Sequence, residues 1–327
     1  MRKRRLGRTG YEVSEIGFGA WGLGGNMWLG VDDEEGKEAL RTALDLGIDF
    51  LDTALVYGEG HSEKLIGQVL RERGIGEDGG VVVATKVPPM DYEWPGKKGT
   101  PLMKTFPREW VIECVERSLR NLGFGELHLV QFHVWHDAWL EADEWPEVRD
   151  TLALLQKQGK VLHWGVSANS HHPETAFRLL SDPLIETVQA IYNIYDRSPE
   201  HGLIDLVREK DLGFVVRVPF DEGALTGTIG PETQFPKGDW RNRYFAGDRK
   251  REVAKRADEL KELLGPEAGT LPELALRFCL QRPEVSTVIP GMRRPAHARA
   301  NVAASDGRKL SPAMMERLAP FAWDKSW

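Results

Sequence analysis

Cysteine is scarce in this chain: only Cys114 and Cys279 occur among 327 residues. Two cysteines cannot build the disulfide framework of a small secreted domain, and both lie in stretches of helical periodicity. We therefore expect reduced, buried thiols in a cytoplasmic protein. Basic residues begin the chain but no apolar segment follows them, and no run of about 18 apolar residues occurs anywhere, so we expect neither a leader nor a membrane partner.

An excess of positive charge is also missing. The formal net charge is −7, and the one basic run, Arg2 to Arg5, leads directly into a Gly-rich turn. Nucleic-acid binding depends largely on neutralised phosphates, so this balance argues against such a partner. The apolar fraction of 41% and the charged fraction of 28% are those of a globular protein with a sizeable core.

What the sequence does contain is a long alternation of strand and helix patterns. Glycine or a change of hydrophobic period separates the segments. We expect helices at 33–46, 61–73, 108–122, 147–158, 173–180, 202–210, 249–264, 272–281 and 295–303. We expect strands at 16–18, 48–52, 81–86, 127–133, 161–167, 187–191, 214–218 and 286–289.

Eight strands, each followed by a helix, predict one α/β domain over residues 1–327, built as a TIM-type (β/α)8 barrel. A doubly wound open sheet is the competing architecture. Residues 1–15 predict a β-hairpin beneath the barrel, and the additional helical stretches near the C-terminus predict extra helices. The longest aperiodic stretch, 221–248, predicts a functional or mobile loop.

A glycine motif near the N-terminus resembles a dinucleotide fingerprint. Gly17, Gly19 and Gly22 have the spacing G-x-G-x-x-G, but Leu23 to Asn26 cannot open a helix, and the next acid at a strand end, Asp52, is too distant. We interpret these glycines as a tight loop that a ligand approaches closely.

The stronger signal is the position of polar residues at strand ends. Asp52, Lys86 and His133 end three consecutive strands, and Tyr57 lies on the loop after the first of these. Each could be a cap, a surface charge or a packed side chain. Together they form an arc on one face, and a buried Asp and Lys are expected to pair. A phenol beside an ammonium has a lowered pKa, which predicts a tyrosine general acid.

The sequence around these residues resembles the aldo-keto reductases from Arg4 to about Asn301. DTALVYGEGHSEKLIG is similar to the segment of the catalytic Asp and Tyr, ATKV to that of the catalytic Lys, and SLRNLGFGELHLVQFH to that of the catalytic His. Cofactor segments follow in the order of the family as GKVLHWGVS, VQAIYN, VPFDEGALTG and VIPGMRR.

The resemblance implies carbonyl reduction with NADPH on a barrel without a Rossmann domain. Tyr57 would be the acid, tuned by Lys86 and Asp52, and His133 would orient the carbonyl. The implied substrate-pocket residues are Trp21, Trp28, Val56 and Trp135. The implied cofactor-binding residues are Ala20, Trp21, Asp52, Ser167, Gln189, Arg217, Pro219, Leu225, Gly291, Met292, Arg293, His297 and Asn301.

Some positions depart from the family pattern. Ala168 stands where an asparagine is usual, and Asn169 comes one position late. Arg217 replaces a frequent aromatic residue, although a guanidinium plane can also stack on a nicotinamide. His297 stands where Gln or Arg is commoner, and Ala300 stands where Glu is commoner. Arg293 and Arg294 still favour a 2′-phosphate, and hence NADPH over NADH.

Two further functions stay open. One is a cofactor-binding regulatory subunit with slow turnover, similar to the potassium-channel β-subunits of this family. The other is a metal-dependent hydrolase using His133, His136, His163 and His171, whose spacing does not match a helical zinc motif. We expect no metal and a small carbonyl substrate, whose identity the sequence leaves open along with the oligomeric state.

Overall fold

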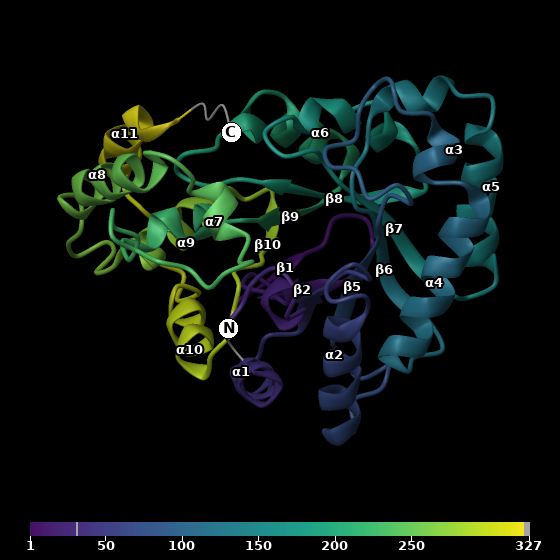
Figure 1. Cartoon of the computed structure of the whole chain (residues 1–327), viewed down its shortest axis with the longest axis horizontal. Helices are drawn as coiled ribbons and strands as arrows, with labels where there is room; N and C mark the ends of the chain where they lie inside the picture. Colours follow the sequence, from purple (N-terminus) through teal and green to yellow (C-terminus); the bar gives the residue numbers. More distant parts are fainter. Residues whose placement is uncertain (31, 324–327) are drawn as a thin grey trace.

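The structure, a computed structural model, describes residues 1–30 and 32–323, and Figure 1 shows its strands surrounded by helices. Eight parallel strands follow the order β10-β9-β8-β7-β6-β5-β4-β3, so neighbours in the sheet are neighbours along the chain. A doubly wound sheet would reverse its strand order near the middle. The strands are β3 (Phe18–Gly19), β4 (Phe50–Asp52), β5 (Val82–Val87), β6 (Leu127–Phe132), β7 (Val161–Ser167), β8 (Ile185–Ile191), β9 (Gly213–Arg217) and β10 (Val285–Val288).

The first and last strands meet and close the sheet. Ile16 bridges Val288, and Gly19 bridges Gly291, both in parallel orientation. Position 19 requires glycine, because a Cβ atom there would lie 2.6 Å from the carbonyl oxygen of Ile289. The prediction of an eight-stranded βα-barrel is confirmed.

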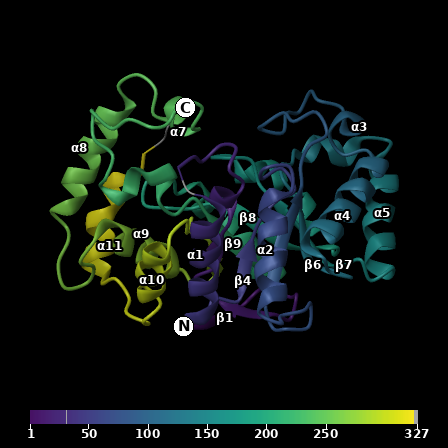
Figure 2. The same ribbon diagram turned by 60° about the horizontal axis from the view of Figure 1, so that its bottom comes forward.

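Helices surround the barrel, and Figure 2 shows α1 beside α2, with α10 at the seam where the sheet closes. Most helices bury one apolar face against the strands, as their periodicity predicts. The helices are α1 (Asp33–Asp45), α2 (His61–Glu72), α3 (Leu102–Thr105), α4 (Arg108–Leu122), α5 (Trp145–Lys157), α6 (Leu203–Lys210), α7 (Arg241–Tyr244), α8 (Arg249–Lys261), α9 (Leu271–Leu280), α10 (Pro295–Ala303) and α11 (Pro312–Leu318).

The N-terminal hairpin fills one end of the barrel. Strands β1 (Lys3–Arg5) and β2 (Glu12–Ser14) pair antiparallel, and the buried side chains of Leu6 and Val13 join a small apolar cluster inside the barrel. The cluster also contains Phe50, Val82, Ala84, Leu129, Val215 and Ile289. The predicted hairpin beneath the barrel is therefore confirmed, and its apolar plug leaves the opposite end for polar groups.

The alternation of side chains along each strand determines which residues face the interior. On β5, Val82 and Ala84 belong to the interior cluster, whereas Val83 and Val87 pack against the surrounding helices. A strand has a side-chain period of two, so Lys86 points inward above Ala84. The same rule places the polar ends of the other strands inside the mouth of the barrel.

The helix expected at 173–180 is not formed, and this prediction is wrong. Two short 3-10 helices, Pro173–Ala176 and Leu179–Ser181, replace it. The carboxylate of Asp137 accepts hydrogen bonds from the backbone N–H groups of Arg178 and Leu179 at 2.7 and 3.1 Å. Those N–H groups would otherwise donate within a continuous helix.

Both cysteines are buried and free, as expected: Cys114 lies on α4 and Cys279 on α9. Within residues 1–30 and 32–323, we find no helix with the length and apolar composition needed to cross a bilayer.

Candidate active site

A buried ion pair joins the ends of β4 and β5. Lys86 Nζ lies 2.6 Å from Asp52 Oδ1 and donates a second hydrogen bond of 2.7 Å to the Thr53 carbonyl oxygen. The exposed fractions of the two charged side chains are 0% and 3%. Burial lowers the pKa of Lys86, and the carboxylate of Asp52 opposes this shift. The pairing predicted from the sequence is confirmed.

Tyr57 reaches this pair from the loop after β4. Its hydroxyl lies 3.5 Å from Lys86 Nζ, and the same nitrogen is 5.1 Å from the centroid of the ring. Burial raises the pKa of Tyr57, and the Asp52 carboxylate raises it further. The guanidinium of Arg217 lowers this pKa, but burial of the phenol and the nearby carboxylate outweigh that effect. The lowered pKa expected from the sequence is therefore wrong for this structure.

His133 stands on the other side of Tyr57, directly after β6. The two rings are 5.7 Å apart at 72°, and the indole of Trp94 lies 5.8 Å from the imidazole at 87°. Burial lowers the pKa of His133 well below 6.5, and the charges of Lys86 and Arg217 lower it further. The imidazole is therefore neutral near pH 7. Nδ1 is buried without a hydrogen-bond partner among the described residues.

A pair of glutamines lies among the catalytic candidates. Gln189 Nε2 donates to Asp52 Oδ2 at 2.7 Å, across the barrel from β8 to β4. The same amide nitrogen is 3.5 Å from Gln131 Oε1, and Gln131 Nε2 is buried without a partner among the described residues. Sequence reasoning missed Gln131. The alternation of Leu129, Gln131 and His133 along one strand is the signal that could have found it.

The predicted nicotinamide residues lie on adjacent strand ends. Ser167 on β7 is in register with Gln189 on β8, and both residues are buried. Arg217 ends β9, and its Nη2 atom donates to Ala168 O at 3.1 Å and to Ser170 Oγ at 3.3 Å. Its Nε atom is buried and lacks a partner among the described residues. These polar groups have the chemistry needed to hold a carboxamide.

The next residue, Val218, has a φ of +55°, a left-handed conformation that a β-branched residue rarely adopts. Asn193 Nδ2 donates to the Val218 carbonyl oxygen at 3.0 Å and holds the turn. Asp221 and Glu222 also have positive φ angles. Backbone strain of this kind gathers at binding sites, and here it follows directly after Arg217.

Arg293 and Arg294, proposed for the adenosine end, are both engaged with the protein. Arg293 Nη1 donates to Leu29 O at 2.9 Å, and Arg294 Nε lies 3.0 Å from Glu35 Oε1. A Cβ at Gly22 would lie 2.5 Å from Arg293 Cδ. The close approach expected at the glycine motif is therefore made by the side chain of Arg293.

The other predicted cofactor positions differ in burial. Asn301 is buried, and its Nδ2 atom has no partner among the described residues. Burial lowers the pKa of His297, and the neighbouring arginines add to this shift. The side chains of Leu225 and Met292 are fully buried in the core. Ala20 and Pro219 are buried near the strand ends, and Gly291 is exposed.

Aromatic side chains border Tyr57. The ring of Trp21 stacks on Tyr57 at 6.1 Å and 28°, and Trp28 contacts Trp21 at 5.8 Å. Trp240, which sequence reasoning missed, lies 6.3 Å from Trp21. Val56 is half-buried in the same loop as Tyr57.

Trp135 is the exception among the predicted pocket residues. It is fully buried, and its Nε1 atom donates to Asp137 Oδ1 at 3.1 Å. Its ring packs against Phe106, Trp139 and Trp145. The assignment of Trp135 to the substrate pocket is wrong, because the chain turns its side chain outward into the layer between β6 and the helices. Trp94 takes the place beside His133.

The aperiodic stretch 221–248 is tied to the loop after β3. Trp240 N donates to Met27 O at 2.8 Å, and the fully buried carboxylate of Asp239 accepts from Leu29 N at 3.1 Å. The guanidinium of Arg241 lies 4.4 Å above the Trp28 ring. Two long loops thus build one side of the site together.

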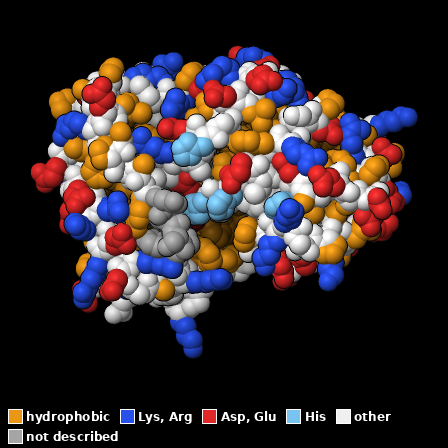
Figure 3. Space-filling view, turned by 90° about the horizontal axis from the view of Figure 1, so that it is seen from above, with side chains coloured by type: hydrophobic (Ala, Val, Ile, Leu, Met, Phe, Trp, Pro, Cys, Tyr) orange, Lys and Arg blue, Asp and Glu red, His pale blue; other side chains and the backbone are white. Residues whose placement is uncertain are grey.

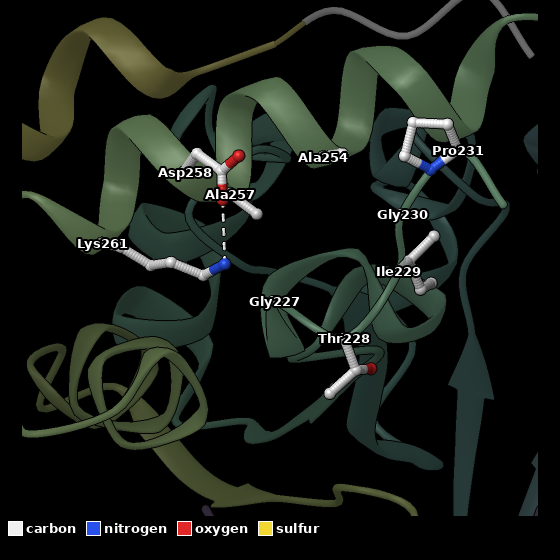
Figure 4. A pocket seen from close by; sticks show the side chains of 9 residues that line it. All are labelled: Gly227, Thr228, Ile229, Gly230, Pro231, Ala254, Ala257, Asp258 and Lys261. Carbon is white, nitrogen blue, oxygen red and sulfur yellow. Dashed lines mark hydrogen bonds and ion pairs between the residues drawn. The ribbon is translucent and has the colours of Figure 1, made fainter. Parts of the chain in front are cut away.

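Two cavities lie near these loops. One, of about 430 Å³, is lined by Gly24, Gly25, Asn26, Gly58, Glu59 and His61, next to the loop that carries Tyr57. The other, of about 260 Å³, lies between α8 and the stretch after β9, where Lys261 pairs with Asp258 (Figure 4). In Figure 3, a hollow with hydrophobic side chains inside opens beside histidine side chains.

The histidines of the hydrolase alternative are spread over the molecule. His163 pairs with Glu186 at 2.7 Å and His171 with Asp196 at 2.5 Å, while His133 faces Tyr57. In the part of the chain that the structure describes, no three His, Cys, Asp or Glu side chains gather where they could hold a metal ion.

Comparison with known proteins agrees with this geometry. The model of the aldo/keto reductase family matches residues 15–321. The aldo-keto reductase YhdN of Bacillus subtilis is 31% identical over 92% of this chain and 87% of its own length. A probable voltage-gated potassium channel subunit beta of Arabidopsis thaliana is 29% identical over 99% of this chain and 95% of its own length. The holo form of aldo-keto reductase AKR11C1 from Bacillus halodurans superimposes with a TM-score of 0.75 at 27% identity, covering 100% of this chain and 99% of that one.

A closed βα-barrel with Asp, Lys, Tyr and His at its mouth defines a class of oxidoreductases. This chain belongs to the aldo/keto reductase family.

Proposed function

We propose that this protein reduces aldehydes or ketones to alcohols with NADPH, and that Tyr57 is the general acid. The single observation that carries the proposal is the arrangement of Tyr57, Lys86 and Asp52, in which one ammonium lies 3.5 Å from the phenol oxygen and 2.6 Å from the carboxylate. The hydroxyl of a phenol held in this way is fixed at the mouth of the barrel, where it can donate its proton.

Each of the four residues has a distinct task. A nicotinamide held at this site would supply the hydride that the carbonyl carbon accepts. Tyr57 donates its hydroxyl proton to the carbonyl oxygen, and Lys86 stabilises the phenolate that remains. Asp52 holds Lys86, and Gln189 holds the second oxygen of Asp52. Neutral His133 donates from Nε2 and orients the carbonyl oxygen.

The residues around the strand ends fit a nicotinamide dinucleotide. Ser167 and Gln189 would bind the carboxamide. Arg217, whose Nε atom has no partner among the described residues, would lie against the nicotinamide ring. At the other end of the site, the unpartnered amide of Asn301 supports contact with the adenosine portion.

Arg293 and Arg294 support NADPH, because arginine is suited to a phosphate group. To bind that phosphate, Arg294 must give up its ion pair with Glu35. We expect NADPH to bind more tightly than NADH, and replacing Arg294 with Met should reduce the difference. Equal dissociation constants for the two cofactors in the unsubstituted protein would overturn this choice, and fluorescence titration measures both.

The reaction is tested by following NADPH oxidation with a panel of aldehydes and ketones. Tyr57→Phe should lower kcat by about 10² to 10⁴-fold, the usual contribution of a positioned acid. Tyr192→Phe is the matched control, because this buried tyrosine donates to Glu200 on the far side of the barrel wall. Undiminished turnover in Tyr57→Phe would refute the assignment of the acid.

A regulatory subunit that binds cofactor and turns over slowly is the second candidate. It is supported by the similarity to a protein named as a potassium channel subunit. Purification from native extract distinguishes the two, since a stable stoichiometric partner together with a kcat far below about 1 s⁻¹ would favour the subunit. A free protein with rapid turnover would favour the enzyme.

A further inference from the structure

The middle of the loop between β5 and α3 is exposed, with one exception. From Tyr92 to Gly99 every residue is exposed except Gly96, which is buried. Trp94 lies two residues before that glycine and places its ring 5.8 Å from His133 although it is itself 42% exposed. The attachment of Gly96 therefore helps to set the position of Trp94, together with the contact between the Trp94 and Tyr92 rings at 6.3 Å.

Gly96 is held by the side chain of Asn169. The amide oxygen of Asn169 accepts from Gly96 N at 2.9 Å, and the amide nitrogen donates to Gly96 O at 3.0 Å. Both backbone groups of one residue are thus satisfied by a single side chain, as a neighbouring strand would satisfy them. The same amide nitrogen also donates to Trp135 O at 2.9 Å and to Thr175 Oγ1 at 3.2 Å.

The fit around Gly96 is tight. A Cβ atom at this position would lie 2.9 Å from Trp139 Cη2, 3.3 Å from the carbonyl carbon of Trp135 and 3.4 Å from Asn169 Oδ1. A side chain could enter only if the loop or the Trp139 ring moved. The loop has a further attachment nearby, because Trp139 Nε1 donates to Thr100 O at 2.7 Å.

We propose that Asn169 is a positioning residue for the substrate: it fixes Gly96 and thereby sets Trp94 against His133. Both polar atoms of its amide are engaged by the protein, so we assign Asn169 to the loop and not to the cofactor. Trp94 faces the His133 side of the reacting carbonyl, and Trp21 stacks on the Tyr57 side. The carbonyl thus enters between two indoles, which favours flat, unsaturated substrates over small polar ones.

This inference rests on the proposed reductase function, and kinetics test it first. Asn169→Ser, Gly96→Ala and Trp94→Ala should each raise KM for benzaldehyde about three- to tenfold, the value of a lost aromatic contact. The KM for propanal should change less, and kcat and the dissociation constant of NADPH should remain within about twofold of the unsubstituted values. Met90→Ala is the control, an exposed apolar residue of the same loop.

A double variant separates positioning from general damage. If Asn169 acts through Trp94, then Asn169→Ser combined with Trp94→Ala should have the KM of Trp94→Ala alone. Additive effects would overturn the proposal. So would an Asn169→Ser variant with weaker NADPH binding and an unchanged KM, because that result makes Asn169 a cofactor ligand.

A readout without substrate tests the same contact if the chain is not a reductase. Lys97 and Lys98 are exposed next to Gly96, so trypsin reports how firmly the loop is held. Cleavage there should be about tenfold faster in Asn169→Ser and Gly96→Ala, as expected for the loss of one or two hydrogen bonds, and unchanged in Met90→Ala. Equal cleavage rates in all the variants would overturn the role of Asn169, whereas faster cleavage without any carbonyl reduction would refute the proposed function alone.

Discussion

Lys86 Nζ and Asp52 Oδ1 lie 2.6 Å apart, and both side chains are shielded from solvent. Because a buried charge is costly when its partner is removed, Asp52→Asn should lower the free energy of unfolding by about 3–5 kcal/mol. The double variant Asp52→Asn with Lys86→Met should regain much of that loss while staying inactive. Urea unfolding and NADPH oxidation measure the two effects, and a double variant as unstable as the single one would contradict the coupling.

The lowered pKa of His133 makes stability depend on pH. Below pH 6.5 the unfolded chain protonates this histidine while the folded protein does not, so the free energy of unfolding falls as the pH is lowered. The slope contributed by one group is about 1.4 kcal/mol per pH unit. His133→Gln should therefore flatten the decline between pH 6.5 and 5. His201→Gln, at an exposed histidine, serves as the control. An equal dependence of the free energy of unfolding on pH in both variants would contradict the lowered pKa of His133.

Arg217 should control the pH profile of the reverse reaction. Its guanidinium lowers the pKa of Tyr57, so Arg217→Met raises that pKa. In alcohol oxidation Tyr57 would have to accept a proton, and the alkaline rise in kcat should therefore move to higher pH by about one unit or less. Arg217→Lys keeps a positive charge and should preserve most of the profile. An identical profile for Arg217→Met would show that this charge does not act on the phenol.

The strain at Val218 can be measured directly. A left-handed conformation costs a β-branched residue about 1–2 kcal/mol, which glycine avoids. Val218→Gly should therefore leave the melting temperature unchanged or raise it by a few degrees, despite the entropy that glycine adds to the unfolded chain. Val216→Gly removes a fully buried side chain two residues earlier and should be destabilising by about 3 kcal/mol or more. Similar losses in both variants would indicate that Val218 is not strained.

Periodicity was sufficient for most of the fold. The apolar runs ending at Asp52 and Lys86 place strands β4 and β5 correctly, and eight such runs separated by helices favour a barrel, although they also allow a doubly wound sheet. The segment 173–180 was mistaken for one helix because its pattern gives no sign that Asp137, about 40 residues earlier, takes two of its backbone N–H groups. Local patterns do not report hydrogen bonds made by distant side chains.

The sequence by itself indicated the four candidate catalytic residues, through polar residues at three strand ends, a tyrosine on the loop beside them and the resemblance of these segments to the aldo-keto reductases. Only the tertiary structure decided what surrounds them. It buried Trp135, brought Trp94 and Trp240 from long loops, and placed the guanidinium of Arg217 where it lowers the pKa of Tyr57. Strand positions follow from residues close along the chain, whereas the burial of a loop side chain and the field at a phenol depend on segments far apart in sequence.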